Sequence, residues 1–169
     1  MQTMGNASTT GGPRLPASDR AHLLLVASTG GHLAQLLTLR TWWSRFDRTW
    51  VTFDKADARS TLAGERIVFA HHPTTRNLPN AARNLVLARR TLADVRPSLI
   101  VSTGAGVAAP FFYLAKIEGI PSLYIEVFDR IASTTLTGRM CHLVASAFCV
   151  QWTDQQTLYP GADYIGQLL

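Results

Sequence analysis

The feature that most constrains the fold is an alternation of short apolar runs with longer amphipathic segments, which begins at His22. A short run that is apolar throughout is typical of a parallel strand buried on both faces, and helical spacing marks the segments between the runs. We expect helices at residues 33–43, 77–95, 107–118 and 137–145, with a short one before the last strand. The strands are expected at residues 22–28, 49–53, 66–70, 98–103, 122–127, 148–152 and 163–165.

This alternation predicts an α/β fold, a Rossmann-like parallel sheet with helices on both faces. The length of 169 residues allows one such domain, at residues 21–169, and excludes a complete two-domain enzyme. Residues 1–20 are rich in Gly, Ser, Thr and Pro, which predicts a disordered N-terminal arm.

The charge of the chain is low and is carried mostly by arginine. Charged residues make up 16% of the sequence, and 14 arginines against two lysines give most of the net charge of +5. Arginine pairs well with phosphates, so the balance indicates a phosphorylated ligand, an anionic lipid or nucleic acid. The arginine codons of a GC-rich genome explain it equally well. No aromatic and basic residues interleave as in a nucleic-acid surface, so we expect no nucleic-acid partner.

Metal binding and membrane insertion find little support in the sequence. Cys141 and Cys149 have no Cys-x-x-Cys spacing and belong to no His/Cys cluster of usable spacing, so we expect buried free thiols and no metal site. The sequence has no signal peptide, and no apolar run reaches about 18 residues. The chain is therefore expected to be cytoplasmic, and any membrane contact to be peripheral.

Ligands of parallel α/β sheets bind beyond the carboxyl ends of the strands, so the loops that follow the strands are the candidate sites. The first loop contains Gly30, Gly31 and His32. Two glycines bring backbone N–H groups to the start of a helix, where an anion is favoured. A plain turn with a surface histidine is the alternative.

The loop after the predicted strand at residues 98–103 has the pattern G-x-G-x-x-A, with Gly104 and Gly106. Glu126 follows about 20 residues later, as in a dinucleotide fingerprint. Pro110 and the late position of the pattern in the chain argue against a nicotinamide or flavin cofactor, and we expect no resident cofactor. The glycines could instead cradle a phosphate or admit close helix packing.

The helix predicted at residues 77–95 has two distinct faces. Positions 78, 81, 85, 88, 92 and 95 are spaced to form one buried stripe. The residues Arg76, Arg83 and Arg90 align on the opposite side, with Val86 and Leu87 beside them. Arginines next to exposed aliphatic residues favour a membrane or partner surface, although an ordinary solvated face is equally compatible.

The fourth candidate is the loop that begins at Glu126. A carboxylate at the end of a strand suits catalysis or a hydrogen bond to a sugar hydroxyl. Arg130 and Arg139 could hold a diphosphate, and the Ser/Thr residues at 133–137 offer an N-cap for the next helix. Capping and a structural ion pair are the alternative interpretation.

Read in order, these loops resemble a known family. The turn at Gly30–Leu33 looks like that of MurG-type lipid-linked glycosyltransferases. The fuller match is to the accessory subunits of bacterial exopolysaccharide and capsule glycosyltransferases, which are similar to the membrane-recruiting subunit of the eukaryotic dolichol-linked N-acetylglucosaminyltransferase. The segments that carry the resemblance are residues 28–32, 73–78, 102–106, 110–115, 124–128, 136–139, 150–152 and 159–160.

The resemblance implies that the chain is the acceptor-side half of a split GT-B glycosyltransferase. A second chain would supply the nucleotide-sugar site, and the pair would extend a polyprenyl-diphosphate-linked sugar on the inner face of the cell membrane. Inversion at the sugar carbon is expected by analogy alone. We expect no N-terminal membrane anchor like that of the eukaryotic relative, so membrane attachment is expected to come from an amphipathic surface or from the partner.

Within this hypothesis His32 is the first candidate for the catalytic base, because imidazole titrates near neutral pH, and Glu126 is the second. The acceptor phosphates would be held by Gly30, Gly31, Gly104 and Gly106 with Arg76 or Arg130. The partner or membrane surface would include Arg83, Val86, Leu87, Arg90, Gln151 and Trp152. Two alternatives stay open: a non-catalytic module that recruits the catalytic chain to the membrane, and a small dinucleotide-dependent oxidoreductase.

Overall fold

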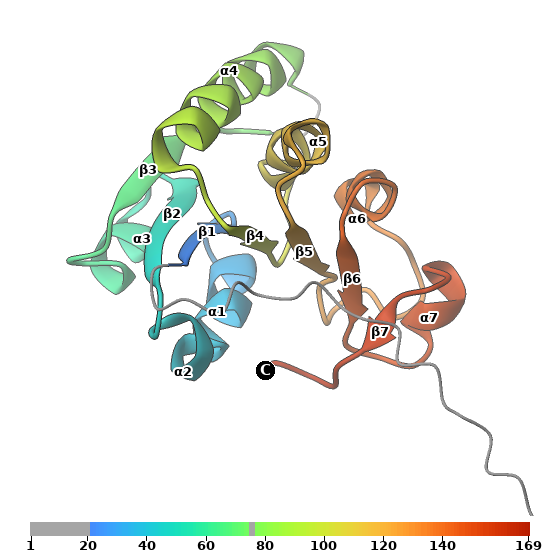
Figure 1. The fold of residues 1–169 in the computed structure, drawn as a ribbon. Helices are drawn as coiled ribbons and strands as arrows, with labels where there is room; N and C mark the ends of the chain where they lie inside the picture. The colour runs from blue at the N-terminus through green and yellow to red at the C-terminus, as the bar shows by residue number, and fades with distance from the viewer. Residues whose placement is uncertain (1–20, 75–76) are drawn as a thin grey trace, which may run out of the picture.

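The computed structural model of the chain describes residues 21–74 and 77–169, which form a seven-stranded sheet flanked by helices (Figure 1). The strand order is β3-β2-β1-β4-β5-β6-β7, and every neighbouring pair is parallel. The expected fold class is confirmed. The strands are β1 (His22–Val26), β2 (Asp47–Phe53), β3 (Ile67–Ala70), β4 (Leu99–Ser102), β5 (Ser122–Ile125), β6 (Ala147–Val150) and β7 (Asp163–Tyr164).

Helices cover both faces of the sheet. On the central strand β1, Leu24 and Val26 face one apolar core, while Leu23 and Leu25 face the other. This explains why the run is apolar at every position. In Figure 1, α4, α5 and α6 lie on one side of the sheet and α1 and α2 on the other. The helices are α1 (Gly31–Thr38), α2 (Arg40–Trp43), α3 (Ala56–Thr61), α4 (Leu78–Val95), α5 (Ala108–Glu118), α6 (Leu136–His142) and α7 (Gln155–Leu158).

Two helices differ from the expected ones. The helix expected at residues 33–43 begins earlier, at Gly31, and is interrupted at Leu39, which separates α1 from α2. Helix α3 lies in a segment where no helix was expected.

The expected N-cap of α6 is confirmed, because the Thr135 hydroxyl accepts a hydrogen bond from the N–H of Gly138 at 2.8 Å. The expected disordered arm, residues 1–20, lies outside the described residues.

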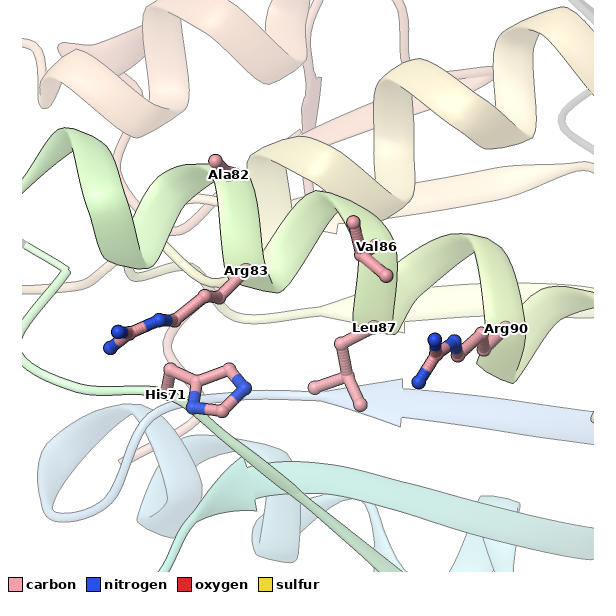
Figure 2. A pocket seen from close by; sticks show the side chains of 6 residues that line it. All are labelled: His71, Ala82, Arg83, Val86, Leu87 and Arg90. Atoms are coloured by element: carbon pink, nitrogen blue, oxygen red, sulfur yellow. The ribbon is translucent and has the colours of Figure 1, made fainter.

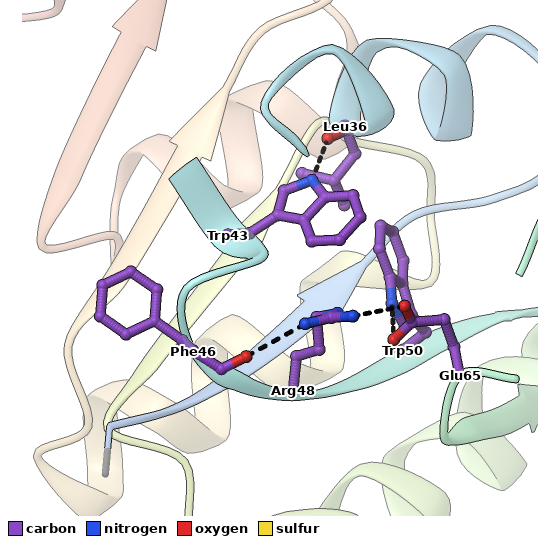
Figure 3. Close-up of polar contacts among 6 residues, drawn as sticks. All are labelled: Leu36, Trp43, Phe46, Arg48, Trp50 and Glu65. Carbon is purple, nitrogen blue, oxygen red and sulfur yellow. Dashed lines mark hydrogen bonds and ion pairs between the residues drawn. The ribbon is translucent and has the colours of Figure 1, made fainter. Parts of the chain in front are cut away.

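An aromatic and charged cluster fixes α2 against the amino end of β2 (Figure 3). The Arg48 guanidinium lies over the Trp43 ring, 4.8 Å from its centroid, and donates to Glu65 at 2.6 Å. The indole N–H of Trp50 donates to the other oxygen of Glu65 at 3.2 Å. The cluster is at the opposite end of the strands from the candidate loops, so its role is structural.

The predicted buried stripe of α4 is right only in part, because Ala88 and Leu92 are buried but other members are exposed. Leu78 is 83% exposed and Leu85 is 47% exposed, whereas Asn80 and Asn84 are buried together with Ala88, Thr91 and Leu92. The asparagines face inward because they satisfy the backbone that leads from β3 to α4. Asn84 accepts from the N–H of His71 at 2.8 Å and donates to its carbonyl at 2.9 Å, and Asn80 donates to the carbonyl of Pro73 at 3.0 Å.

Candidate functional site

The turn after β1 places two glycines and a histidine at the carboxyl edge of the sheet. Gly30 has φ +70°, a backbone conformation that residues with a side chain rarely adopt, and α1 starts at the next residue. The N–H of Gly30 donates to the Asp57 carboxylate of α3 at 3.1 Å. The Asp57 carboxylate therefore already accepts from one of the backbone N–H groups that we expected to bind an anionic ligand.

The ring of His32 is fixed by a contact with the backbone just after β4. Its Nδ1 lies 2.8 Å from the carbonyl oxygen of Thr103, and the Thr103 hydroxyl donates to the carbonyl of His32 at 2.6 Å. A carbonyl only accepts hydrogen bonds, so Nδ1 carries the proton in the neutral ring. The lone pair is then on Nε2, and the half-buried imidazole can accept a proton there.

Gly104 and Gly106 allow close contacts between loops. A Cβ at Gly104 would lie 3.1 Å from the His32 ring and 3.0 Å from the Tyr124 hydroxyl, and its φ is +108°. A Cβ at Gly106 would lie 3.0 Å from the Thr74 hydroxyl. The structure thus brings two of the candidate site residues, Gly104 and His32, together.

Glu126, the second candidate base, is fully buried just after β5. Its carboxyl group accepts hydrogen bonds from the Tyr159 hydroxyl at 2.6 Å, from the N–H of Val127 at 3.1 Å and from the Thr135 hydroxyl at 3.2 Å. Burial raises the pKa of Glu126, while these hydrogen bonds and the nearby His32 lower it in part. A carboxyl group enclosed in this way is better suited to holding the loop and α6 than to meeting a substrate.

Sequence reasoning gave no role to Tyr159 and did not find the contact of Gly138 with Glu126. Tyr159 reaches Glu126 from a position 33 residues later in the chain, and its hydroxyl also accepts from the N–H of Thr135 at 3.1 Å. Burial raises the pKa of Tyr159 well above its ordinary value. A Cβ at Gly138 would overlap the Glu126 carboxyl group. A buried acid near a helical glycine is a weak signal, and Tyr159 was marked only by the family resemblance of residues 159–160, which predicted no contact for it.

Two residues expected at a partner surface differ in burial. Gln151 is fully buried, so the expectation of an exposed contact there is wrong for the isolated chain. Its side chain is held by hydrogen bonds to Gln35, to the carbonyl of Glu126 and to the N–H of Leu168. Trp152 is half-buried, and its indole N–H donates to the carbonyl of Phe128 at 2.6 Å.

The candidate phosphate-binding arginines are placed unequally. Arg130 is exposed at the end of the loop that starts at Glu126, and Arg139 is exposed on α6. The ion pairs among the described residues are Arg48–Glu65 and Arg59–Asp54, so the guanidinium groups of Arg130 and Arg139 remain available. Arg76 lies outside the described residues.

A shallow groove of about 360 Å³ lies along α4 (Figure 2). Leu87 is partly buried and packs against the core, while Val86 is 52% exposed. Arg83 and Arg90, two of the three arginines of the expected row, therefore border aliphatic surface. The groove is lined by His71, Ala82, Arg83, Val86, Leu87 and Arg90.

Within residues 21–74 and 77–169 no group of three or more His, Cys, Asp and Glu side chains is placed to hold a metal ion. In the same residues no helix is long and apolar enough to cross a bilayer. Cys141 and Cys149 are buried free thiols, as expected. Burial raises the pKa of Cys141 to about 12 and that of Cys149 to about 11, so both stay protonated at neutral pH.

The fold and the site define a class: a parallel α/β lobe like the N-terminal domain of a GT-B protein, with its loops gathered at the carboxyl edge. The solved structure of Acinetobacter baumannii MurG matches 87% of this chain with a TM-score of 0.71 at 18% identity. The match spans 45% of the MurG chain, so one lobe of that enzyme corresponds to the present chain.

The family follows from the sequence comparison. Residues 23–168 match the family described as "Oligosaccharide biosynthesis protein Alg14 like", and the chain belongs to that family. The UDP-N-acetylglucosamine transferase subunit ALG14 of Debaryomyces hansenii is 23% identical, over 98% of this chain and 84% of its own length. A UDP-N-acetylglucosamine–N-acetylmuramyl-(pentapeptide) pyrophosphoryl-undecaprenol N-acetylglucosamine transferase of Parabacteroides distasonis is 24% identical, over 78% of this chain and 39% of its own length. These matches leave the oxidoreductase alternative unsupported.

Proposed function

We propose that the chain is the acceptor-binding subunit of a two-chain glycosyltransferase, which moves a sugar from a nucleotide sugar to a polyprenyl-diphosphate-linked saccharide. The observation that carries the proposal is the family match, together with a fold that corresponds to one lobe of a MurG-type enzyme. The family match covers nearly the whole chain, yet the fold spans 45% of a MurG chain. The names of the relatives favour UDP-N-acetylglucosamine as the donor. Exopolysaccharide or capsule synthesis is the pathway that the sequence resemblance favours.

The proposed chemistry places the catalytic base at His32. Its Nε2 takes the proton of the acceptor hydroxyl, whose oxygen forms a bond to the anomeric carbon of the donor sugar. The bond from that carbon to the nucleotide diphosphate breaks at the same time, and the diphosphate leaves on the partner chain. The contact to Thr103 supports this role, because it keeps the proton on Nδ1 and the lone pair on Nε2.

The acceptor diphosphate would bind beside His32. Arg130 and the loop of Gly104 and Gly106 are the candidates, together with Arg76. The backbone of Gly30 and Gly31 is a weaker candidate, since Asp57 already accepts from the Gly30 N–H. A phosphate at that position would have to displace the carboxylate.

The helices α4, α5 and α6 are proposed to face the anionic inner leaflet of the membrane. They lie on the same side of the sheet (Figure 1), and large apolar side chains are exposed on each of them. Arg83 and Arg90 beside the α4 groove would pair with lipid phosphates. The exposed apolar residues are Leu78, Leu85 and Val86 on α4, Tyr113 and Ile117 on α5, Leu136 and Met140 on α6, and Leu143 just after α6.

Flotation with anionic liposomes tests the membrane surface. The double variant Arg83→Glu/Arg90→Glu should lose most of the binding, and neutral liposomes should bind poorly. Arg40→Glu/Arg45→Glu makes the same charge change at exposed positions on or beside α2, on the other side of the sheet, and should bind like the wild type. Equal binding by both double variants would refute the placement.

A reconstituted pair of chains tests the base. The variant His32→Ala should lower kcat at least 100-fold, as expected for removal of a general base. Full turnover by this variant would refute the assignment.

The second candidate function is a recruiting module without catalytic residues. The Asp57 contact at Gly30 and the enclosed carboxyl group of Glu126 favour it. A soluble short-chain acceptor separates the two functions. A recruiter becomes dispensable when acceptor and catalytic chain are both in solution, whereas an acceptor-binding subunit is still required.

A further inference from the structure

The turn after β6 holds the main chain of the loop at residues 126–130. Its side chains donate hydrogen bonds to four of the five carbonyl groups in that loop, those of residues 126, 127, 128 and 130. The donors come from a stretch of five residues, 151–155. The contacts are Gln151 to Glu126 at 2.8 Å, Gln155 to Val127 at 2.9 Å and to Arg130 at 3.3 Å, and Trp152 to Phe128 at 2.6 Å.

The turn that provides these donors is itself ordered by Gln155. The side-chain oxygen of Gln155 accepts from the N–H of Gln151 at 2.9 Å and from that of Trp152 at 3.1 Å. Both glutamines are fully buried. A buried polar group is costly unless every partner is present, and a satisfied network specifies one arrangement.

Gln151 also connects the loop to α1 and to the C-terminal segment. Its amide nitrogen donates to the side chain of Gln35 on α1, and its oxygen accepts from the N–H of Leu168 at 2.9 Å. Gln35 is buried one turn after His32 on the same helix. The same side chain thus contacts the elements that carry both candidate bases.

We propose that Gln151, Trp152 and Gln155 are positioning residues, which hold the loop at residues 126–130 so that Arg130 meets the diphosphate of the acceptor. The inference rests on the proposed function for the identity of the ligand. The loop has no regular secondary structure, and Asp129 and Arg130 are exposed. Its shape therefore depends on the carbonyl contacts, and the three donors touch no substrate themselves.

Hydrogen exchange of the isolated chain tests whether the loop is held. Trp152→Phe removes the indole N–H and keeps an aromatic ring at a half-buried position. Exchange of the amides at residues 127–135 should rise about fivefold, the effect of one net hydrogen bond. Trp42→Phe is the matched control, because Trp42 is also half-buried and its indole N–H has no hydrogen bond within the described chain. An unchanged rate in Trp152→Phe would overturn the proposal.

A second pair of variants guards against a general loss of stability. Gln155→Met removes the contacts to the loop, while Gln156→Met makes the same change at an exposed neighbour that bonds to Ala162. Gln155→Met should increase exchange in the loop more than in β1 and β2. A uniform increase over the whole chain would indicate a structural role alone and refute positioning.

Kinetics of the two-chain enzyme test what the loop is held for. In Trp152→Phe the KM for the lipid-linked acceptor should rise about fivefold, and the KM for the nucleotide sugar should stay unchanged. Faster exchange with an unchanged acceptor KM would refute the positioning role. If the wild-type pair has no transferase activity, the proposed function fails, and the exchange experiment still decides whether the turn holds the loop.

Discussion

Removal of the Tyr159 hydroxyl should destabilise the fold through two specific partners. The hydroxyl donates to Glu126 at 2.6 Å and accepts from the N–H of Thr135 at 3.1 Å, and Tyr159 is 1% exposed. In Tyr159→Phe the ring can stay in place, so the packing against Phe148 is kept. The perturbation is therefore the loss of two hydrogen bonds in a buried site.

The magnitude follows from the groups that are left behind. The Thr135 N–H loses its acceptor, and the Glu126 carboxyl group keeps the N–H of Val127 and the Thr135 hydroxyl as donors. Each of the two hydrogen bonds lost costs about 1–1.5 kcal/mol, so the free energy of unfolding should fall by about 2–3 kcal/mol. For a domain of this size such a loss is a large part of the total free energy of unfolding.

Urea denaturation followed by circular dichroism measures this change. The urea concentration at the midpoint of unfolding should fall, while the dependence of the free energy of unfolding on urea concentration stays constant. This combination indicates a change in stability alone. Tyr164→Phe is the control, because Tyr164 is 52% exposed and should change the stability by less than about 0.5 kcal/mol. A loss below about 0.5 kcal/mol in Tyr159→Phe as well would refute the reasoning about the Glu126 contacts.

Three further predictions concern the same edge of the sheet. Gly138→Ala should destabilise by about 3 kcal/mol in urea, although alanine favours helices, because its Cβ would overlap the Glu126 carboxyl group; a neutral or stabilising effect would contradict the packing. Burial raises the pKa of Glu126, so the folded state retains the proton and stability should fall as the pH rises from about 4.3 through the higher pKa of the folded state. Glu126→Gln should remove this pH dependence of stability, measured by urea titrations at several pH values. If stability changed with pH in the variant as it does in the wild type, the role of Glu126 would be contradicted. Nitrogen-15 NMR at alkaline pH should show His32 with its proton on Nδ1, and a proton on Nε2 would disprove the Thr103 contact.

The strands were predictable because each is a short run that is apolar on both faces. Leu23 and Leu25 face one core and Leu24 and Val26 the other, so burial alone determines that pattern. The glycine turn before His32 was found for a similar reason, since tight turns at strand ends restrict the residue type. The family resemblance was then recognised from the order of the loop motifs along the chain.

The face of α4 and the contacts of the site were not predictable. Asn80 and Asn84 are inside because they bond to the backbone before α4, and polarity alone indicates the opposite. The donors to the Glu126 loop come from Gln151 and Gln155, 25 and 28 residues from the carbonyls of Glu126 and Val127. Such contacts depend on the strand order, which brings β6 beside β5. No local sequence pattern predicts them.

The most direct measurement asks whether this chain can transfer a sugar when it is purified by itself. The assay supplies UDP-N-acetylglucosamine, other nucleotide sugars and a prenyl-diphosphate saccharide, and follows the lipid product by mass spectrometry. We expect no product from the chain alone, and product once a second chain with the nucleotide-sugar lobe is added. Efficient synthesis by the isolated chain would contradict the proposal of a split enzyme.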